Sequence, residues 1–434
     1  MGGTKFNKKT IRDINLKGKL VLVRADYNVP IRADGEIADD YRIQQSLPTL
    51  QYLIKQGCKV VICSHMGRPS GKRDRHCSLK PVAQHLQKLL DQPVEFVDEC
   101  IGPVAEKAAA KLTAGQVLVL ENLRFHPEEE ANDPIFAKAL ARLGEVFVQD
   151  GFGVVHRAHA STEAITHELP SVAGLLLEKE VTVLQGVIDE PERPLMAIIG
   201  GAKIADKIDV LERFIDIADF VVIGGAMANT FLLAKGVETG KSITDPDELP
   251  MAKKIMAKAV KKAKQQPFVF YLPQDGVVAT SLSKTAHTRI VDWQAHVIAD
   301  IQNYPQRPPR EASKIKPNEF IFDIGPFSGA FIAGGMQLAK TVIWNGTMGV
   351  TEVSPASGLG PVGPFAHATE LIVEAMLGQH GHRPFSVVGG GDTVSYVESR
   401  QLTDSFNHVS TGGGATLELM SGKKLPGIEA LKAK

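Results

Sequence analysis

Short runs of β-branched residues, each ending in Gly, Asp or His and followed by a helix-like segment, recur along this chain and constrain its fold more than any other feature. The first 151 residues contain KLVLVRAD, KVVICSH, QVLVLEN and EVFVQDG. The pattern returns in PLMAIIGG, DFVVIGG, PFVFYLPQD, TVIWNG, FSVVGGGD and NHVSTGGGA. Apolar strands that alternate with helices are typical of βα units and a parallel sheet. We therefore expect an α/β protein with two doubly wound parallel-sheet, Rossmann-like domains.

The segment between the two series, GLLLEKEVTVLQGVIDE, has apolar residues at helical spacing and predicts one helix that joins the halves. A length of 434 residues also favours two or three domains over one. We expect an N-terminal domain over 1–174, an interdomain helix over 175–191 and a C-terminal domain over 192–412, with 413–434 returning toward the N-terminal domain. The proline-rich, charged stretch NYPQRPPREASKIKPNEF is expected to be a surface excursion.

Charge and cysteine content argue against several classes of protein. Because 49 Lys and Arg residues balance 49 Asp and Glu residues, the net charge gives no support for a nucleic-acid partner. The four cysteines form no C-x-x-C pair, which argues against a disulfide framework or a zinc site and favours a reducing, cytoplasmic setting. The segment MGGTKFNKKT has no apolar core, and the longest apolar-looking stretch is interrupted by Asp219, a Gly-Gly pair and Asn229. We therefore expect no targeting signal and no membrane association.

Charged and polar residues follow the apolar runs of the first half, at the expected carboxyl ends of its strands, where open parallel sheets bind ligands. Arginine dominates this set, and its guanidinium presents a fixed fork of donors that suits an oxyanion. A single arginine is equally well explained by a surface salt bridge, but several at one sheet edge predict a substrate with both carboxylate and phosphate. The set comprises Arg24, Asp26, Asn28, His65, Arg68, Arg124, His156, Arg157 and His159, with Arg42 at the start of a helix.

The stretch GFGVVHRAHAS sets His156 and His159 three residues apart and leaves several interpretations open. The pair could be part of a metal site, an acid/base pair, or donors to an anion. A metal site needs further ligands, and the neighbouring arginines would repel a cation. The acid/base and anion-binding interpretations both remain on the residues alone.

Glycine-rich turns follow the apolar runs of the second half, in IIGGAKIADKI, VIGGAMAN, VVGGGDTVS and STGGGATLE. Such turns let the backbone approach phosphate oxygens, while the next helix supplies unpaired N–H donors. One such turn more often means tight packing, whereas four in one domain predict a nucleotide site. Lys203 and Lys207 are four residues apart, so we expect them to share one helix face within reach of a phosphate chain; Asp392 is either a helix N-cap or a magnesium ligand. GVETGKS has the wrong spacing for a phosphate-binding loop, so we expect Lys241 to be a solvated surface lysine.

Nine ordered motifs, spanning about residue 15 to residue 427, resemble those of the phosphoglycerate kinase family. They are RADYNVP, SHMGRP, ENLRFHPEEE, DGFGVVHRAHAS, GGAKIADKI, DIGPFS, WNGTMGVTE, GGGDTVSYVE and STGGGATLELMSGKKLPG. The resemblance implies two Rossmann-like domains joined by a hinge helix, with the glycerate substrate on the N-terminal domain and Mg-nucleotide on the C-terminal one. It implies reversible phosphoryl transfer from 1,3-bisphosphoglycerate to ADP, giving 3-phosphoglycerate and ATP.

The resemblance also implies roles for individual residues. Arg42 and Lys203 would neutralise charge on the transferred phosphoryl group. The residues implied to hold 3-phosphoglycerate are Arg24, Asp26, Asn28, His65, Arg68, Arg124, His156, Arg157 and His159. The nucleotide would contact Gly201, Lys203, Lys207, Asn345, Glu352, Gly389, Gly390, Gly391, Asp392 and Thr393, with Glu352 on the ribose and Asp392 also on Mg²⁺.

The implied reaction has an already ionised oxygen as nucleophile in both directions, so it needs no general base. Catalysis should then rest on positioning and charge neutralisation. His156 and His159 are accordingly expected to be donors at an anion pocket, with His159 in contact with the ligand and His156 orienting Arg157 or packing against the strand end. In-line transfer between two domains also implies hinge closure. The family suggests a monomer that uses Mg²⁺ together with ADP or ATP.

Two alternatives remain open, one because of departures from the family pattern and one because of fold analogy. Thr347 in WNGTMG replaces the usual proline, Ala226 replaces a common third glycine, and 284–320 matches poorly, which leaves the adenine pocket open. The first alternative is a binding or scaffold protein that keeps both ligand sites but turns over little. The second is an NAD-linked dehydrogenase, which rests on fold analogy alone because no G-x-G-x-x-G with an acidic partner follows a strand.

Overall fold

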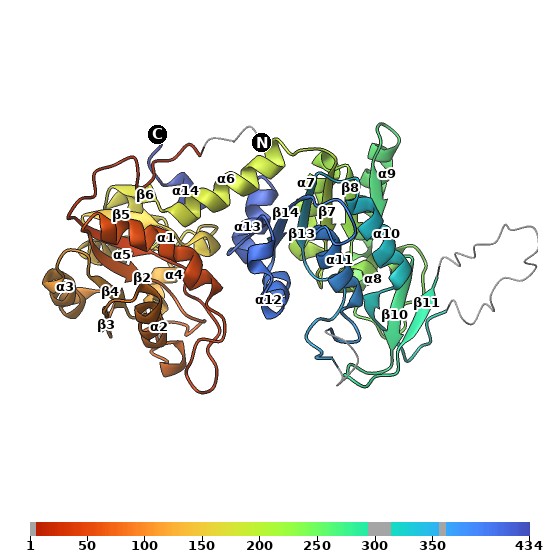
Figure 1. The fold of residues 1–434 in the computed structure, drawn as a ribbon, viewed down its shortest axis with the longest axis horizontal. Coiled ribbons are helices and arrows are strands. Elements are labelled where there is room, and N and C mark those ends of the chain that lie inside the picture. The colour runs from red at the N-terminus through yellow and green to blue at the C-terminus, as the bar shows by residue number, and fades with distance from the viewer. Residues whose placement is uncertain (1–5, 294–313, 356–361) are drawn as a thin grey trace, which may run out of the picture. The chain divides into compact units, whose positions relative to one another are not determined.

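The computed structural model describes residues 6–293, 314–355 and 362–434, and both predicted series of βα units fold into parallel sheets within it. The chain separates into two units (Figure 1). We call Gly2–Gln185 with Thr411–Lys434 the N-terminal unit, and Gly186–Ser410 the C-terminal unit. The greater part of the predicted proline-rich excursion, 303–313, lies outside the described residues.

The N-terminal unit is built on a six-stranded parallel sheet of order β3-β4-β2-β1-β5-β6. Its central strands are buried on both faces, as the uninterrupted apolar runs require. The strands are β1 (Leu20–Arg24), β2 (Lys59–Cys63), β3 (Val94–Val97), β4 (Val117–Leu120), β5 (Val146–Gln149) and β6 (Ser171–Ala173).

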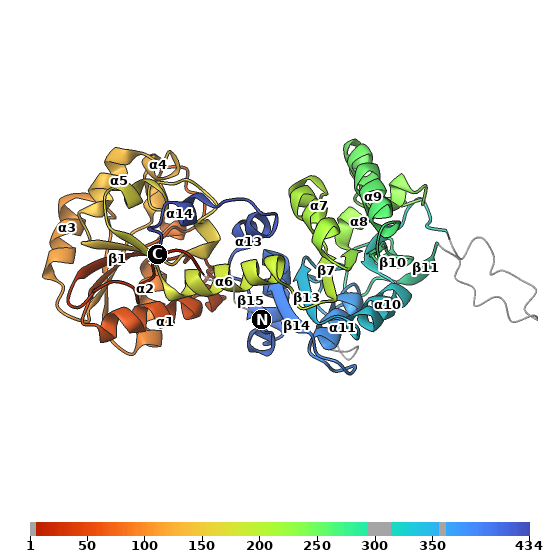
Figure 2. The same cartoon turned by 90° about the horizontal axis from the view of Figure 1, so that it is seen from above.

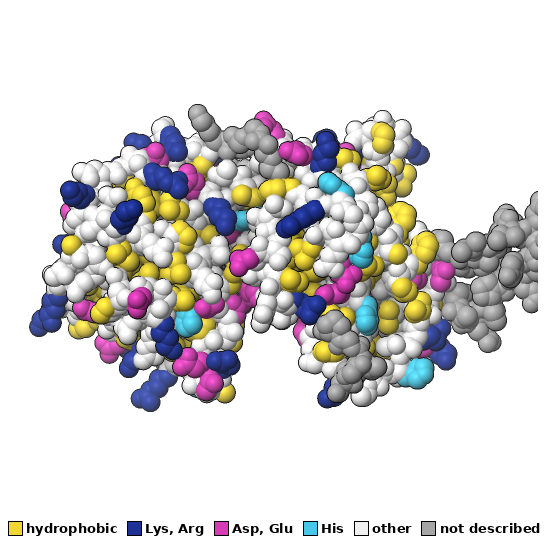
Figure 3. Space-filling model, in the orientation of Figure 1, with side chains coloured by type: hydrophobic (Ala, Val, Ile, Leu, Met, Phe, Trp, Pro, Cys, Tyr) yellow, Lys and Arg dark blue, Asp and Glu magenta, His cyan; other side chains and the backbone are white. Residues whose placement is uncertain are grey.

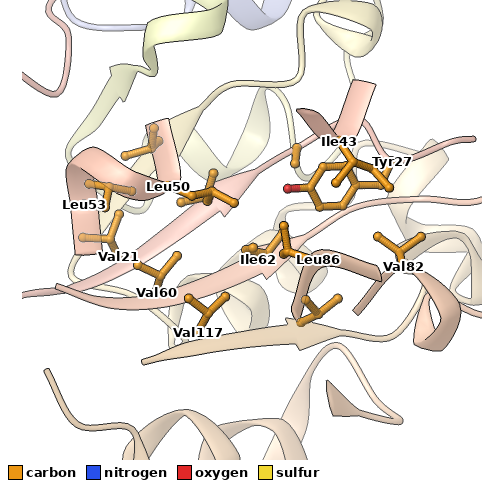
Figure 4. Packing of buried hydrophobic residues seen from close by; sticks show 14 of the residues in the cluster. Val21, Tyr27, Ile43, Leu50, Leu53, Val60, Ile62, Val82, Leu86 and Val117 are labelled. Atoms are coloured by element: carbon orange, nitrogen blue, oxygen red, sulfur yellow. The ribbon is translucent and has the colours of Figure 1, made fainter. Parts of the chain in front are cut away.

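Helices cover both faces of this sheet (Figure 2). Val21 of β1 belongs to a cluster that also contains Leu50 of α1 (Tyr41–Lys55) and Leu86 of α2 (Lys80–Leu90) (Figure 4). The next residue, Leu22, belongs to a second cluster, which includes Phe136 of α5 (Pro134–Ala141). Alternate side chains of one strand thus fill two cores, as a doubly wound sheet requires. The remaining short elements are η1 (Arg75–Cys77), α3 (Gly102–Lys111), η2 (Leu123–Phe125), α4 (Pro127–Glu130), η3 (Phe152–Val154) and η4 (Ala164–His167).

The C-terminal unit contains a second six-stranded parallel sheet, of order β15-β14-β13-β7-β8-β9. These strands are β7 (Leu195–Ile199), β8 (Phe220–Ile223), β9 (Val269–Tyr271), β13 (Thr341–Asn345), β14 (Phe385–Gly389) and β15 (His408–Val409). The predicted α/β class with two doubly wound parallel sheets is therefore confirmed. A three-stranded antiparallel sheet, β11-β10-β12, was not predicted; its strands are β10 (Asp275–Ala279), β11 (Arg289–Asp292) and β12 (Phe320–Ile324).

The helices of the C-terminal unit are amphipathic or buried according to their place in the layers. One face of α7 packs inward through Val210, Leu211, Phe214 and Ile215. No helix in the described ranges is long and apolar enough to cross a membrane. The elements are η5 (Ala205–Lys207), α7 (Ile208–Ile217), α8 (Gly225–Ala234), η6 (Pro246–Glu248), α9 (Leu249–Ala263), α10 (Pro326–Met336), α11 (His367–Met376), α12 (Gly391–Ser399) and η7 (Thr403–Ser405).

The segment predicted to be one joining helix is α6 (Leu175–Asp189), and the division between the units falls inside it. The chain after Ser410 packs with the N-terminal unit: the N–H and hydroxyl of Thr411 donate to Glu180 Oε1 of α6 at 2.6 and 2.7 Å. This segment carries α13 (Gly413–Met420) and α14 (Pro426–Glu429), and Gly427 N donates to Val155 O at 2.9 Å. Grouping the turn in STGGGATLE with the glycine-rich turns of the second half was therefore wrong, because these contacts hold it in the N-terminal unit.

Asp150, directly after β5, caps the start of α6. Its Oδ1 accepts hydrogen bonds from the N–H groups of Leu176 at 3.0 Å and Leu177 at 3.3 Å. The carboxyl group is buried, and burial raises its pKa to about 7. The joining helix is thus fixed to a strand end through a carboxyl group that titrates near neutral pH.

We expect Asp150→Asn to gain stability relative to the wild type as the pH rises. The native pKa lies above the unfolded value of 3.8, so between pH 3.8 and about 7 the native state binds a proton that the unfolded chain has released. Stability is therefore lost across that window in the wild type, whereas asparagine keeps the acceptor and carries no charge. Thermal melts followed by circular dichroism should show a higher relative midpoint for Asp150→Asn at pH 8 than at pH 4. Asp189→Asn, at the exposed end of α6, is the control and should show no such trend; a gap that does not widen with pH would contradict the prediction.

Candidate active site

Parallel strands β1, β2, β4 and β5 end at one edge of the N-terminal sheet, and the predicted anion-binding residues follow them there. Asp26 is the centre of the group: Arg42 Nη1, from the start of α1, donates to Asp26 Oδ2 at 3.2 Å and to Asn28 O at 3.1 Å. Gly153 lies so close to the Asp26 carboxylate that a Cβ there would collide with it. Gly153, the second glycine of DGFG, is thus needed for the close approach of the loop after β5 to the loop after β1.

The loops after β1, β2 and β4 are tied together through Gly67. Asn28 Oδ1 accepts from Gly67 N at 2.9 Å, and Arg124 Nη1 donates to Gly67 O at 2.9 Å. Arg124 also pairs with Glu130, its Nε lying 3.3 Å from Oε1. Arg68, the next residue in the β2 loop, is exposed. The structure therefore brings Asp26, Asn28, Arg42 and Arg124 into one bonded network.

His65 lies among several guanidinium groups. Burial, followed by the charges of Arg24, Arg124, Arg42 and Arg157, holds the pKa of its imidazole well below the ordinary value. The ring is therefore neutral at physiological pH. Four cations act on one buried position, which is the electrostatic environment that an anionic ligand would relieve.

His156 and His159 are neutral for the same reasons. Burial and neighbouring arginines lower the pKa of each to about 4. Arg157 Nε donates to His156 Nε2 at 3.1 Å, so that nitrogen is an acceptor and the imidazole holds Arg157 in place. Gly414, at the start of α13, lies against the same ring, since a Cβ there would be 3.1 Å from His156 Nε2. The start of α13 therefore lies against this group, a contact that the sequence analysis did not predict.

Arg24 occupies a different position from the other arginines. Its side chain is 1% exposed, and its nitrogens donate to Ser161 Oγ at 2.8 Å, to His65 Nδ1 at 3.2 Å and to Ala25 O. Ser161 Oγ in turn donates to the buried Glu129 at 2.6 Å. These contacts make Arg24 a residue that positions His65. Arg24 itself is buried, unlike the exposed Arg68 and the partly exposed Arg42.

The glycine-rich turns of the C-terminal unit surround a cavity of about 800 Å³. Of the predicted residues, Gly201, Glu352 and Asp392 line it, and so do Ala226 and Thr347, the two departures from the family pattern. Close packing of two strand ends requires some of these glycines: a Cβ on Gly200 would collide with the backbone of Gly346 and Thr347. The cavity is large enough for a nucleotide-sized ligand.

The prediction that Lys203 and Lys207 share a helix face is wrong, because Lys203 lies on a turn before η5. Lys207 Nζ donates to Asn345 Oδ1 at 2.7 Å, to Asn345 O at 3.1 Å and to Gly200 O, and burial lowers its pKa to about 8. Lys203 is exposed, on a turn whose following N–H groups, those of Ile204 and Ala205, donate to Glu248 at 2.8 and 2.9 Å. The backbone around Lys203 is therefore fixed while its ammonium group is accessible.

The start of α12 presents the remaining predicted residues. Gly390 has φ +90°, a conformation that favours glycine, and a Cβ there would lie 3.0 Å from Asn345 Oδ1. Thr393 Oγ1 accepts from Gly346 N at 2.7 Å. Asp392 is exposed in the first turn and the N-cap is Gly390, so the N-cap alternative for Asp392 is wrong. Gly389 ends β14 and Gly391 begins α12. The exposed N-terminus of a helix next to a carboxylate suits a phosphate chain with its metal ion.

One wall of this cavity was missed in the sequence. Phe320 and Phe322 of β12, whose rings stack 5.3 Å apart, line it together with Trp293. Both phenylalanines belong to the antiparallel sheet that was not predicted, and Trp293 is the residue directly after β11. A signal was present, because EFIFDI is a short run rich in aromatic and β-branched residues, the types enriched in strands. An aromatic wall is suited to a planar base.

Comparison with known proteins gives a consistent result. The family model described as phosphoglycerate kinase matches residues 11–423. A phosphoglycerate kinase of Chloroflexus aurantiacus is 46% identical over 429 residues, which is 98% of this chain and 99% of that protein. One of Moorella thermoacetica is 44% identical over 427 residues, covering 98% and 100%. A solved structure of phosphoglycerate kinase from Coxiella burnetii aligns with TM-score 0.78 at 35% identity, and one from Pyrococcus horikoshii with TM-score 0.79 at 29% identity, each covering 98% of both chains.

Proposed function

This chain belongs to the phosphoglycerate kinase family, and from that premise we propose how its two groups of residues divide the reaction. The enzyme is a phosphotransferase with a carboxyl group as acceptor. It catalyses reversible transfer of a phosphoryl group from 1,3-bisphosphoglycerate to ADP, which gives 3-phosphoglycerate and ATP in glycolysis. The reaction therefore needs one binding site for a glycerate phosphate and another for a nucleotide.

We propose that the strand-end group of the N-terminal unit binds 3-phosphoglycerate and 1,3-bisphosphoglycerate. The observation that carries this assignment is the set of four arginines acting on His65. Arg68, Arg124 and Arg157 would bind carboxylate and phosphate oxygens, while the neutral imidazoles would donate or accept hydrogen bonds without adding charge. Asp26 and Asn28 would orient Arg42 and the substrate hydroxyl. Arg24, His65, His156 and His159 complete the pocket from beneath or beside it.

We propose that the cavity of the C-terminal unit binds ADP and ATP. The aromatic wall of β12 would take the base, Glu352 the ribose, and the turns at Gly201 and at 389–391 the phosphates, with Thr393 holding the turn. Lys207 is already bonded to Asn345, so a phosphate chain would compete with Asn345 for its ammonium group. The exposed Lys203 would reach the terminal phosphate.

Asp392 fits the needs of a nucleotide-bound magnesium ion. The ion commonly takes one or two protein carboxylates and completes its shell with phosphate oxygens and water. Asp392 supplies an exposed carboxylate at the cavity, beside a helix N-terminus that would bind the phosphates. When bound, Mg²⁺ would neutralise phosphate charge; Asp392 would fix its position relative to Lys203.

We propose that transfer is in line and follows closure of the two units about α6. Because each substrate is assigned to a different unit, transfer requires the two sites to be brought together, which also removes water. Both possible nucleophiles are ionised already, so no residue has to remove a proton. Arg42 and Lys203 would stabilise the charge of the phosphoryl group during transfer.

We further propose a cytoplasmic monomer without nucleic-acid or membrane partners. All four cysteines are free thiols, which supports a reducing compartment. On the face shown in Figure 3, basic side chains are interspersed with acidic ones and form no continuous patch.

Replacement of Arg157 tests the substrate assignment. We expect Arg157→Met to weaken binding of 3-phosphoglycerate about 10- to 100-fold, the loss typical of one charge-assisted hydrogen bond. Isothermal titration with 3-phosphoglycerate measures this effect, and binding of Mg-ADP should be unchanged. Arg142→Met is the matched control, because Arg142 is a surface residue whose Nη1 pairs with Glu106 at 3.4 Å. Unchanged 3-phosphoglycerate affinity in Arg157→Met would refute this role for the N-terminal group.

A further inference from the structure

A second set of side chains with metal-binding chemistry lies in the N-terminal unit, outside the strand-end group. Glu99 and Cys100 follow β3, and His126 follows η2. A carboxylate oxygen of Glu99, Sγ of Cys100 and a ring nitrogen of His126 all lie within 4.8 Å of one another. Cysteine spacing alone argued against a zinc site, but the fold brings these three residues together from two separate segments.

The spacing of the three atoms is close to that of a tetrahedral metal site. Bonds of about 2.0–2.3 Å to oxygen, nitrogen and sulfur place neighbouring ligands roughly 3.3–3.8 Å apart. The side chains of Glu99 and His126 are 27% and 28% exposed, so they are free to close by about the ångström required. Cys100 is fully buried beneath them. An ion would therefore enter from the solvent side and rest on Sγ.

Hydrogen bonds already orient two of the three ligand groups, those of Glu99 and His126. Glu99 Oε1 lies 2.8 Å from His126 Nε2 and accepts from Cys100 N at 2.9 Å. Arg73 Nη2 donates to Glu99 Oε2 at 2.9 Å and is the cation that a metal ion would have to displace. Its side chain is 55% exposed, and exposed ion pairs of this kind contribute little. Arg73 is thus a weak competitor.

We propose that Glu99, Cys100 and His126 form a binding site for a thiophilic divalent cation such as Zn²⁺, with water as the fourth ligand. Thiolate and imidazole ligands favour Zn²⁺ and Co²⁺ over Mg²⁺, which prefers oxygen. Binding breaks the Sγ–H bond, forms the metal–sulfur bond and releases the proton to solvent, with no change in oxidation state.

The site has a structural consequence for the substrate group. His126 is two residues after Arg124, whose Nη1 donates to Gly67 O. A bound ion would link the end of β3 to the segment that carries Arg124. It would thereby stabilise the N-terminal unit without taking part in phosphoryl transfer.

Cobalt titration tests the site directly. The protein used is nucleotide-free Cys77→Ser, because Cys77 is the partly exposed thiol and is the other one able to capture metal. We expect a thiolate-to-cobalt charge-transfer absorption that saturates at one equivalent, is displaced by Zn²⁺ and resists excess Mg²⁺. The band should vanish in Cys77→Ser/Cys100→Ser, and Cys77→Ser/His126→Gln should bind at least about tenfold more weakly. Zn²⁺ should also raise the melting temperature of the Cys77→Ser protein.

Several results would overturn the proposal. They are the absence of a charge-transfer band in the Cys77→Ser protein, a band that persists after Cys100→Ser, or affinity that His126→Gln leaves unchanged. His126 is partly exposed, so His126→Gln keeps the test valid if Cys100→Ser fails to fold.

Discussion

Arg42→Met is expected to lower kcat/KM for 1,3-bisphosphoglycerate about 10³-fold, as loss of an arginine that stabilises a phosphoryl group in transfer typically does. Arg42 Nη1 is held by Asp26 and Asn28, so its guanidinium is fixed before substrate arrives. The side chain is nevertheless 30% exposed, which leaves it accessible to a ligand. Methionine keeps the length of the stem and removes the charge. Initial rates of ATP formation measure the effect.

Arg32→Met is the matched control for this variant. Arg32 lies in the loop before α1 and pairs with an exposed carboxylate, its Nε being 3.6 Å from Asp34 Oδ1. It should retain the wild-type rate, and circular dichroism should show both variants folded. Turnover of Arg42→Met close to that of the wild type would remove Arg42 from the mechanism.

Lys203→Met should lower kcat by about 10² to 10³, the cost of removing one preorganised charge from a developing transition state. The effect should fall on kcat far more than on KM for Mg-ADP, because Lys203 is exposed and is proposed to meet the phosphoryl group only as it is transferred. The anchoring of Ile204 and Ala205 by Glu248 keeps the turn in place without the lysine side chain. Steady-state kinetics with varied ADP separate the two constants.

Lys241 provides the control for Lys203. It lies in GVETGKS, is exposed, and its backbone N–H donates to Glu319 O at 2.8 Å, a bond that Lys241→Met preserves. Lys241→Met should keep wild-type kcat. Equal losses in the two variants would mean that lysine charge in general, and not Lys203 in particular, supports turnover.

The sequence predicted the strands whose runs are long and buried and missed the short or half-exposed ones. The apolar runs predicted β1, β2 and β7 directly, whereas β3 has one buried residue in four and β6 is three residues long. β10, β11 and β12 form an antiparallel sheet around residues that resemble a surface excursion, so their pairing depends on contacts far apart in the chain. Local patterns do not contain that information.

The site residues could be predicted because the carboxyl ends of parallel strands meet at one edge of a sheet, and the residues that follow these ends are visible in the sequence. Their individual environments could not be read in the same way. The buried position of Arg24 depends on Ser161 and Glu129, which are more than a hundred residues away in sequence. The placement of Thr411, just before α13, depends on Glu180, and the proposed metal-binding set joins residues from two separate loops. These features arise from packing between distant segments.

Ala226 and Thr347 both line the cavity that we propose for the nucleotide, at positions where the family pattern has a glycine and a proline. Neither position supplies a charge to the proposed mechanism. We therefore expect the two substitutions to adjust the rate and leave the reaction in place, in contrast to a scaffold protein that binds without turnover.

The most direct test of the central claim, that residues on two units act together on one phosphoryl group, is the initial rate of ATP formation by the intact chain from 1,3-bisphosphoglycerate and ADP with Mg²⁺. The proposed division of the site predicts turnover that requires all three components and collapses in both Arg42→Met and Lys203→Met. Tight binding of both substrates with no ATP formed, or ATP formed at an undiminished rate by either variant, would contradict it.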